Sequence, residues 1–317
     1  LWAAKFCLIR SPNIMTTNRV IIKAKCQLGD LLEISENMGA RMLVNKDLPN
    51  FYKLHLLLGL FDLVFVFYQT YVCLMNIRSK IRLFVDSPLG EGQSILLDRD
   101  QANYLFNVMR LNSGDFVSIF NGKNGEWQAE VLHASKRKGI LISKYQSKPQ
   151  LDPPDLWLLF APIKKARTDF IVEKATEMGV SRIRPVNTDY TNSDRIKQNR
   201  LQSHSIEAAE QCGGTYVPPV DELSKLNTVL KDWPKDRLLI FCDESKVGET
   251  VEQLRTIKSK KWAILIGPEG GFSDFEIKYL QSLDFVISIS LGPRVLRADT
   301  AVIAALALWQ SQKGDWL

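Results

Sequence analysis

The sequence predicts a small β-barrel followed by an α/β domain with a mostly parallel sheet. Short segments rich in Val, Ile, Leu, Phe and Trp follow one another closely between residues 81 and 145, which is typical of a barrel. Strand and helix patterns alternate after residue 156, and this alternation favours a parallel sheet covered by helices. The stretch Ser147–Asp155, which contains three prolines, is predicted to link the two regions.

The barrel region contains five predicted strands and one short helix. The run Asn121–Gly125 predicts a hairpin turn, because Asn-Gly steps adopt the backbone conformation that joins adjacent antiparallel strands. The helix is expected near Asn103–Arg110, where it interrupts the series of strands. The strands are expected at Ile81–Asp86, Ser94–Asp98, Asp115–Asn121, Glu126–Ala134 and Gly139–Tyr145.

The α/β region contains nearly continuous apolar or β-branched runs, as expected of strands that are buried on both faces. Its first two helical patterns are expected to end at Gly179 and Gly213, because glycine readily adopts the left-handed conformation that closes a helix. The last helix carries Val302, Leu306 and Trp309 on one face. The strands are expected at Leu156–Ala161, Arg182–Thr188, Leu238–Asp243, Trp262–Gly267 and Phe285–Leu291.

Residues 1–74 differ from the rest, because the chain begins with Leu1 and this region has no clear helical or strand period. The apolar run Leu54–Leu74 is long enough to span a bilayer, but Asp62 near its centre is costly in hydrocarbon. A membrane anchor, a small extra domain and upstream sequence absent from the mature protein are the three interpretations. The third is favoured, because Met75 opens a segment that resembles a natural start. Apart from this run we expect no membrane partner, and we expect the leader to be dispensable.

The composition is typical of a globular protein of about two domains. The five cysteines are scattered without a CxxC pair, and the chain has only three histidines. We therefore expect no metal site and no disulfide framework, and a reducing cytoplasmic location. The net charge of +6 is uneven, since residues 1–80 carry +5, residues 81–150 carry +2 and residues 151–317 carry −1. Any affinity for nucleic acid must then come from local basic clusters.

A glycine-rich loop, Gly267–Gly271, follows the strand expected at 262–267. Glycines at the carboxyl end of a strand let the backbone approach a ligand closely and adopt positive φ, and ligands of α/β sheets bind at that edge. Ser273 and Glu276 predict a capping box that starts the next helix. The spacing matches neither GxGxxG nor a P-loop. Taken alone, the loop fits an ordinary strand–helix turn equally well.

A second polar segment, Leu291–Ala301, also lies between a strand and an apolar helix. Asp299 or Thr300 could cap that helix, which would give these two residues a structural role. Arg294 and Arg297 have no comparable structural explanation, so a functional role is favoured for both.

Together these two segments resemble the RsmE-type family of bacterial 16S ribosomal RNA uracil N3-methyltransferases, within the SPOUT superfamily. Further segments resemble an arginine motif of the family's N-terminal domain, its first helix and its second signature. The motifs occur in the family's order from about Ile81 to Gln312, and residues 1–74 lie outside the resemblance. These further segments are Asn107–Arg110, Ile163–Lys165, Phe170–Val180, Glu207–Cys212 and Val217–Pro218.

The resemblance implies a PUA-like RNA-binding β-barrel over residues 75–147 and a trefoil-knotted SPOUT domain over residues 155–314. It implies that S-adenosylmethionine (SAM) binds in a pocket made by three loops and completed by homodimerisation. Backbone groups would hold the adenine, which explains why glycines are needed more than charges. The implied cofactor-binding residues are Phe241, Gly267, Glu269, Gly270, Gly271, Leu291, Gly292 and Leu296.

The implied reaction is attack of uracil N3 on the methyl group of SAM. Since N3 carries a proton, the uracil anion must be stabilised, and an arginine near O2 or O4 could do this. Arg297 and Arg294 are the candidates, with Asp299 orienting one of them. The family usually has Glu at the position of Asp299 and Arg at the position of Gly214.

The implied partner is 16S rRNA in the small ribosomal subunit. Phosphate contacts would supply affinity, and a splayed single-stranded base would supply specificity. The basic run Lys136–Lys138 fits an RNA contact and a solvated hairpin turn equally well. A SPOUT ribose 2′-O-methyltransferase and a catalytically impaired RNA-binding assembly factor are the alternatives. The RNA-binding residues are expected to be Arg82, Arg110, Lys164, Lys165 and Arg167.

Overall fold

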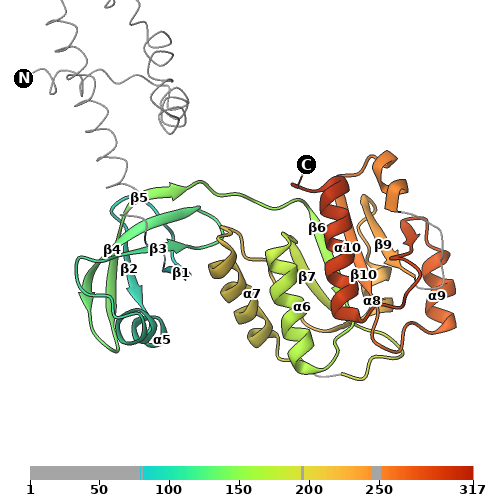
Figure 1. Ribbon diagram of the computed structural model, residues 1–317, viewed down its shortest axis with the longest axis horizontal. Coiled ribbons are helices and arrows are strands. Elements are labelled where there is room, and N and C mark those ends of the chain that lie inside the picture. The colour runs from blue at the N-terminus through green and yellow to red at the C-terminus, as the bar shows by residue number, and fades with distance from the viewer. Residues whose placement is uncertain (1–78, 80, 194–195, 244–250, 317) are drawn as a thin grey trace, which may run out of the picture. The chain divides into compact units, whose positions relative to one another are not determined.

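The computed structural model describes residues 79, 81–193, 196–243 and 251–316 of the chain. The expectations for residues 1–74 lie outside these ranges. Within them, no helix is long and apolar enough to cross a membrane. Two sheets organise the described residues, one on each side of the proline-containing linker (Figure 1).

The first sheet has five strands in the order β1-β3-β4-β5-β2. Strand β1 pairs with β3 in parallel and the other neighbours are antiparallel. The sheet encloses its own core, in which Ile95, Leu105 and Val117 are buried. All five expected strands are present, but β5 continues three residues beyond Tyr145, so the linker starts later than predicted. The strands are β1 Arg82–Phe84, β2 Ser94–Leu97, β3 Phe116–Phe120, β4 Glu126–Ala134 and β5 Gly139–Lys148.

The helix of the barrel begins earlier than the sequence pattern suggests. Helix α5 spans Arg99–Ala102 and continues into the π-helical turn η3, Asn103–Val108. Asp98 causes the early start, because its side chain accepts a hydrogen bond from the Gln101 amide while the Gln101 side chain bonds back to Asp98. The spacing of Asp98 and Gln101 is the sequence signal for this earlier start.

The second sheet has six parallel strands in the order β11-β9-β10-β6-β7-β8. The five strands expected from apolar runs are present. Strand β8 was missed because two polar residues carry no strand pattern. The strands are β6 Leu156–Phe160, β7 Arg182–Asn187, β8 Ser224–Lys225, β9 Arg237–Cys242, β10 Lys261–Ile266 and β11 Val286–Ile289.

Helices cover both faces of this sheet, which explains the continuous apolar strands. Leu158 and Ile264 pack with α6, α7 and α10 in one core, whereas Leu159 and Leu265 pack with α8 and α9 in another (Figure 1). The helices are α6 Lys165–Glu177, α7 Gln198–Cys212, α8 Leu226–Lys231, the 3-10 turn η4 Val251–Thr256, α9 Asp274–Gln281 and α10 Ala298–Lys313. Left-handed Gly179 and Gly213 follow the ends of α6 and α7, as predicted.

Arg82 joins the barrel to the end of α7. Its guanidinium donates to the carbonyl oxygens of Ala209 and Glu210, two groups that the helix end leaves without intrahelical partners. It also donates to the carbonyl of Gly214 and to the Glu126 carboxylate, at 2.7 Å each. Since its donors are occupied inside the chain and its side chain is only 11% exposed, this geometry favours an anchoring role over the RNA contact expected from sequence.

The anchor depends on a charged, buried carboxylate. Burial favours the neutral form of Glu126, but hydrogen bonds from Arg82 and Ser147 and the charges of Arg82 and Lys148 hold the pKa of Glu126 below its usual value. The carboxylate is therefore ionised at neutral pH and pairs with both cations.

We expect Arg82→Ala to lower the free energy of unfolding by about 3 kcal/mol, because removing one partner leaves a buried carboxylate undercompensated. Denaturant titration of the full chain measures this. Lys144→Ala is the control, because it breaks a more exposed pair with Glu130 and should cost less than about 1 kcal/mol. Equal losses in the two variants would contradict the anchoring role.

Candidate functional site

Three neighbouring parallel strands end at the same edge of the sheet. Strand β9 lies between β10 and β11, with Ile240 in register with Ile264 on one side and with Ile287 on the other. The segments that follow β10 and β11 are therefore delivered to one place, as expected of a ligand edge. The segment after β9 belongs to the same edge, but residues 244–250 lie outside the described ranges.

The loop after β10 is held in a tight, defined conformation. Gly271 has φ of 71° and its amide donates to the carbonyl of Pro268 at 3.0 Å. A Cβ on Gly267 would lie 2.6 Å from the ring of Phe272, and one on Gly270 would lie 3.3 Å from Cβ of Tyr190. Glycine is thus required at 267 by packing and at 271 by backbone conformation.

The predicted capping box at the start of α9 is confirmed. The Ser273 hydroxyl accepts from the amide of Glu276, and the Glu276 carboxylate accepts from the amide of Ser273. The buried Glu276 carboxylate also accepts from the amide of Asp189 in the loop after β7, at 3.0 Å. One carboxylate therefore ties two loops of this edge together.

The segment after β11 is open and exposed. Gly292 has φ of 111°, and nothing lies within 4 Å of where its Cβ would be. Leu291 and Leu296 pack partly against the core and fix the two ends of the segment. Helix α10 begins at Ala298, with Arg297 as the residue that precedes it and no side-chain cap.

Neither Asp299 nor Thr300 is the N-cap of α10, because both residues lie in the first turn of the helix. The Asp299 carboxylate nevertheless accepts a hydrogen bond from the Thr300 amide in that turn, at 3.1 Å. It also faces Arg167 at the start of α6, with 3.8 Å between Nε and Oδ2. The same guanidinium lies 3.7 Å from the Glu269 carboxylate in the glycine loop. Arg167 was expected to contact RNA, and the structure places it between carboxylates of two candidate site segments.

Four further basic residues lie in segments that follow strands of this sheet. Lys164 and Lys165 are exposed just after β6, and Arg294 and Arg297 are exposed just after β11. Within the part of the chain that the structure describes, neither arginine has a carboxylate within ion-pair distance. Both guanidinium groups are therefore available to an anionic ligand.

Other expected residues are placed differently. The Phe241 side chain is buried edge-on against Phe272, with ring centroids 5.0 Å apart, so only its backbone is available to a ligand. Arg110 is on the barrel, after η3, with a left-handed φ of 59°. It is not among the residues gathered at the edge after β10 and β11.

Two features of this edge were not predicted from the sequence. Tyr190, which follows β7 and is half exposed, lies beside Gly270; its position after a strand was the available signal. Cys242 ends β9, and burial raises the pKa of its thiol to about 12. The thiol is therefore protonated at neutral pH and is a poor nucleophile.

Comparison with known proteins identifies the family. A model described as an RNA methyltransferase domain matches residues 150–310, and one described as an RNA methyltransferase PUA domain matches residues 97–142. The ribosomal RNA small subunit methyltransferase E of Rickettsia conorii is 30% identical over 229 residues, which cover 71% of this chain and 93% of that protein. The chain belongs to the RsmE-type family of RNA methyltransferases.

Solved structures of similar proteins support the RsmE-type assignment. A putative methyltransferase from Legionella pneumophila, in complex with SAM, is 28% identical with a TM-score of 0.68 and matches 74% of this chain and 98% of that one. The ribosomal RNA small subunit methyltransferase E of Neisseria gonorrhoeae, bound to SAM, is 26% identical with a TM-score of 0.66 and matches 75% and 99%. The predicted α/β fold with a parallel sheet and a PUA domain is thereby confirmed.

Proposed function

We propose that this protein transfers a methyl group from SAM to 16S ribosomal RNA of the small subunit, at N3 of the uracil at position 1498. The observation that carries the proposal is the convergence of the glycine-rich loop, residues 267–271, and the arginine-containing segment, residues 291–301. These segments follow β10 and β11, the parallel strands on either side of β9. The SAM-bound relatives with the same fold support it. We place the reaction in the cytoplasm, where small subunits are found.

The residues at this edge fit an adenosine-containing cofactor. Gly271 and Gly292 have positive φ, a conformation that side chains disfavour, and the space around Gly292 is open, so a ligand can approach the backbone there. In our proposal the segments Gly267–Gly271 and Leu291–Leu296 hold SAM, together with the backbone at the end of β9. When bound, SAM supplies the electrophilic methyl group.

The chain's own charges would then act on the uracil. Arg297 and Arg294 stabilise the negative charge that develops on the base when N3 loses its proton to solvent water. Asp299 was expected to orient one of them, but it lies near Arg167, so we assign it the role of orienting Arg167. Lys164 and Lys165 contact RNA phosphates beside the site.

Two further features belong to this proposal. Strand β10 enters the sheet between β6 and β9, both of which precede it in the chain, and this insertion supports a trefoil knot. We also propose that the protein acts as a homodimer, because the family's cofactor site is completed by a second copy.

We expect N3-methyluridine as the product, because the chain belongs to the RsmE-type family and its exposed Arg294 and Arg297 could stabilise a uracil anion. The test is mass spectrometry of nucleosides from small subunits that lack the modification, after incubation with the full chain and isotopically labelled SAM. Naked 16S rRNA is the comparison and should react more slowly, because residues 81–317 carry few excess cations and would hold free RNA weakly. Label on ribose, on cytidine or on transfer RNA would overturn the assignment, and no label would support the impaired-factor alternative.

A further inference from the structure

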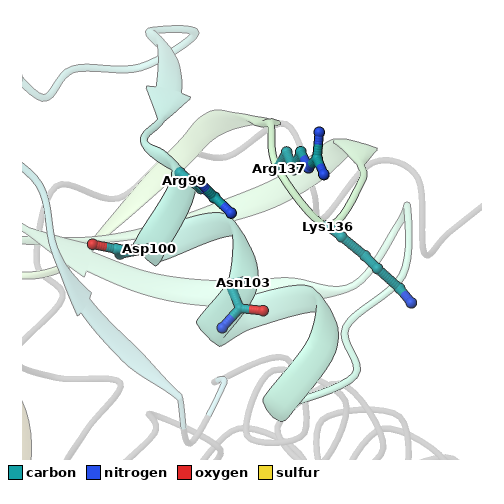
Figure 2. A pocket seen from close by; sticks show the side chains of 5 residues that line it. All are labelled: Arg99, Asp100, Asn103, Lys136 and Arg137. Carbon is teal, nitrogen blue, oxygen red and sulfur yellow. The ribbon is translucent and has the colours of Figure 1, made fainter.

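A basic hollow lies on the barrel between the α5–η3 segment and the turn that joins β4 to β5. It has a volume of about 390 Å³ and is lined by Arg99, Asp100, Asn103, Lys136 and Arg137. Figure 2 shows that Arg99, Asp100 and Asn103 come from the helical segment, while Lys136 and Arg137 come from the turn. None of these five residues belongs to the candidate site described above.

The helical wall of the hollow is fixed to the barrel. The capping box between Asp98 and Gln101 holds the start of α5. The Gln101 side chain also donates to the carbonyl oxygen of Phe84 in β1, at 3.0 Å. Because Arg99 and Asn103 flank this anchor in sequence, their backbone positions are set before any ligand arrives.

The turn that forms the other wall is equally defined. The Ser135 hydroxyl donates to the carbonyl of Lys138 and accepts from its amide, which closes the turn over Lys136 and Arg137. Gly139 packs so closely under η3 that a Cβ there would lie 2.4 Å from the ring of Phe106. The turn that carries the basic run 136–138 therefore has a defined backbone, and the side chains of Lys136, Arg137 and Lys138 are exposed to solvent on it.

The charge of the hollow is not neutralised within the chain. Among the described residues, Arg99, Lys136 and Arg137 have no carboxylate within ion-pair distance, although Asp100 lines the same hollow. Three other cations of the barrel do form ion pairs, namely Arg82 and Lys148 with Glu126, and Lys144 with Glu130. Three cations against one carboxylate leave a preformed excess of positive charge.

We propose that this hollow binds backbone phosphates of the substrate RNA, away from the nucleotide that is methylated. The choice of RNA rests on the proposed function and on the matched PUA region, residues 97–142, which contains both walls. Arginine and lysine supply the charge that a phosphate requires, and the Asn103 amide can donate to a phosphate or ribose oxygen. Such contacts position RNA without reading its sequence.

The test compares two triple variants of the full chain. Arg99→Gln, Lys136→Gln and Arg137→Gln together should weaken binding of a 16S rRNA fragment by roughly tenfold, and should lower the slope of log affinity against log salt by about 2. The control changes the same number of exposed cations elsewhere, by Lys123→Gln, Lys231→Gln and Lys278→Gln, and should have a much smaller effect. Binding is measured without SAM, and SAM affinity is measured separately.

A single substitution tests whether more net positive charge in the hollow strengthens RNA binding. Asp100→Asn should tighten RNA binding by a few-fold, because it removes the only carboxylate that lines the hollow. Unchanged binding in both the hollow triple variant and Asp100→Asn would overturn the proposal, as would equal weakening in the control. The hollow triple variant could also lose affinity for an acidic polypeptide while its RNA binding stays unchanged. That result would overturn the proposal in favour of a protein partner. A third outcome would separate this proposal from the proposed function. If the unmodified protein makes no methylated product but the hollow triple variant still loses RNA affinity, the hollow is upheld and the proposed function is overturned.

Discussion

Gly271→Val is expected to abolish SAM binding while leaving the protein folded. Valine at φ of 71° is strained, at a cost of about 1–3 kcal/mol, and the loop can relieve this strain only by moving the backbone that is proposed to contact the adenosine. Since the proposed contacts come from backbone groups, a small displacement removes several at once. Isothermal titration calorimetry with SAM measures the loss.

Gly92→Val is a matched control for this experiment. Gly92 lies on the barrel with φ of 74° and open space around its Cβ position, so it carries the same backbone strain away from the proposed pocket. Its SAM affinity should equal that of the unmodified chain. Gly270→Val, which places a branched side chain beside Tyr190, should also lose SAM binding. Normal affinity in Gly271→Val and Gly270→Val would place the cofactor elsewhere.

Arg297→Ala is expected to retain SAM binding and to lose methyl transfer by a factor on the order of 10²–10³. The guanidinium is exposed at the start of α10 and in our proposal acts only on the charge that forms during the reaction. The loss should therefore appear in kcat with little change in the KM for SAM. Single-turnover methylation of small subunits measures this step directly.

Arg297→Lys and Arg294→Ala complete the comparison. Lysine keeps the charge but not the forked geometry of arginine, so partial rescue is expected. Arg294→Ala reports whether the second exposed arginine shares the role. Loss of SAM affinity in Arg297→Ala, with normal transfer once SAM is saturating, would show that Arg297 holds the cofactor instead of stabilising the base.

Local signals in the sequence predicted much of the fold. Gly179 and Gly213 marked two helix ends, and Ser273 with Glu276 marked a helix start, because each feature is encoded within a few residues. Strand β8 and helix α8 were not predicted, since a two-residue strand and a six-residue helix contain too little periodicity.

Contacts between distant segments could not be predicted in this way. Arg167 was identified as a basic residue near the ligand edge, but its position between Glu269 and Asp299 depends on the order of strands in the sheet. Arg82 carried the same charge signal as an RNA-binding residue, yet the fold directs it to the end of α7, more than a hundred residues away in sequence. A charge in the sequence does not specify its partner.

Calorimetric titration of SAM into the unmodified full chain is the most direct test of the proposed cofactor site, because it does not require the correct RNA. We expect saturable binding of one SAM per chain, with a dissociation constant in the roughly micromolar range that is usual for enzyme substrates. The product S-adenosylhomocysteine should compete for the same site. A folded protein that shows no saturable binding of SAM would contradict the proposed cofactor site.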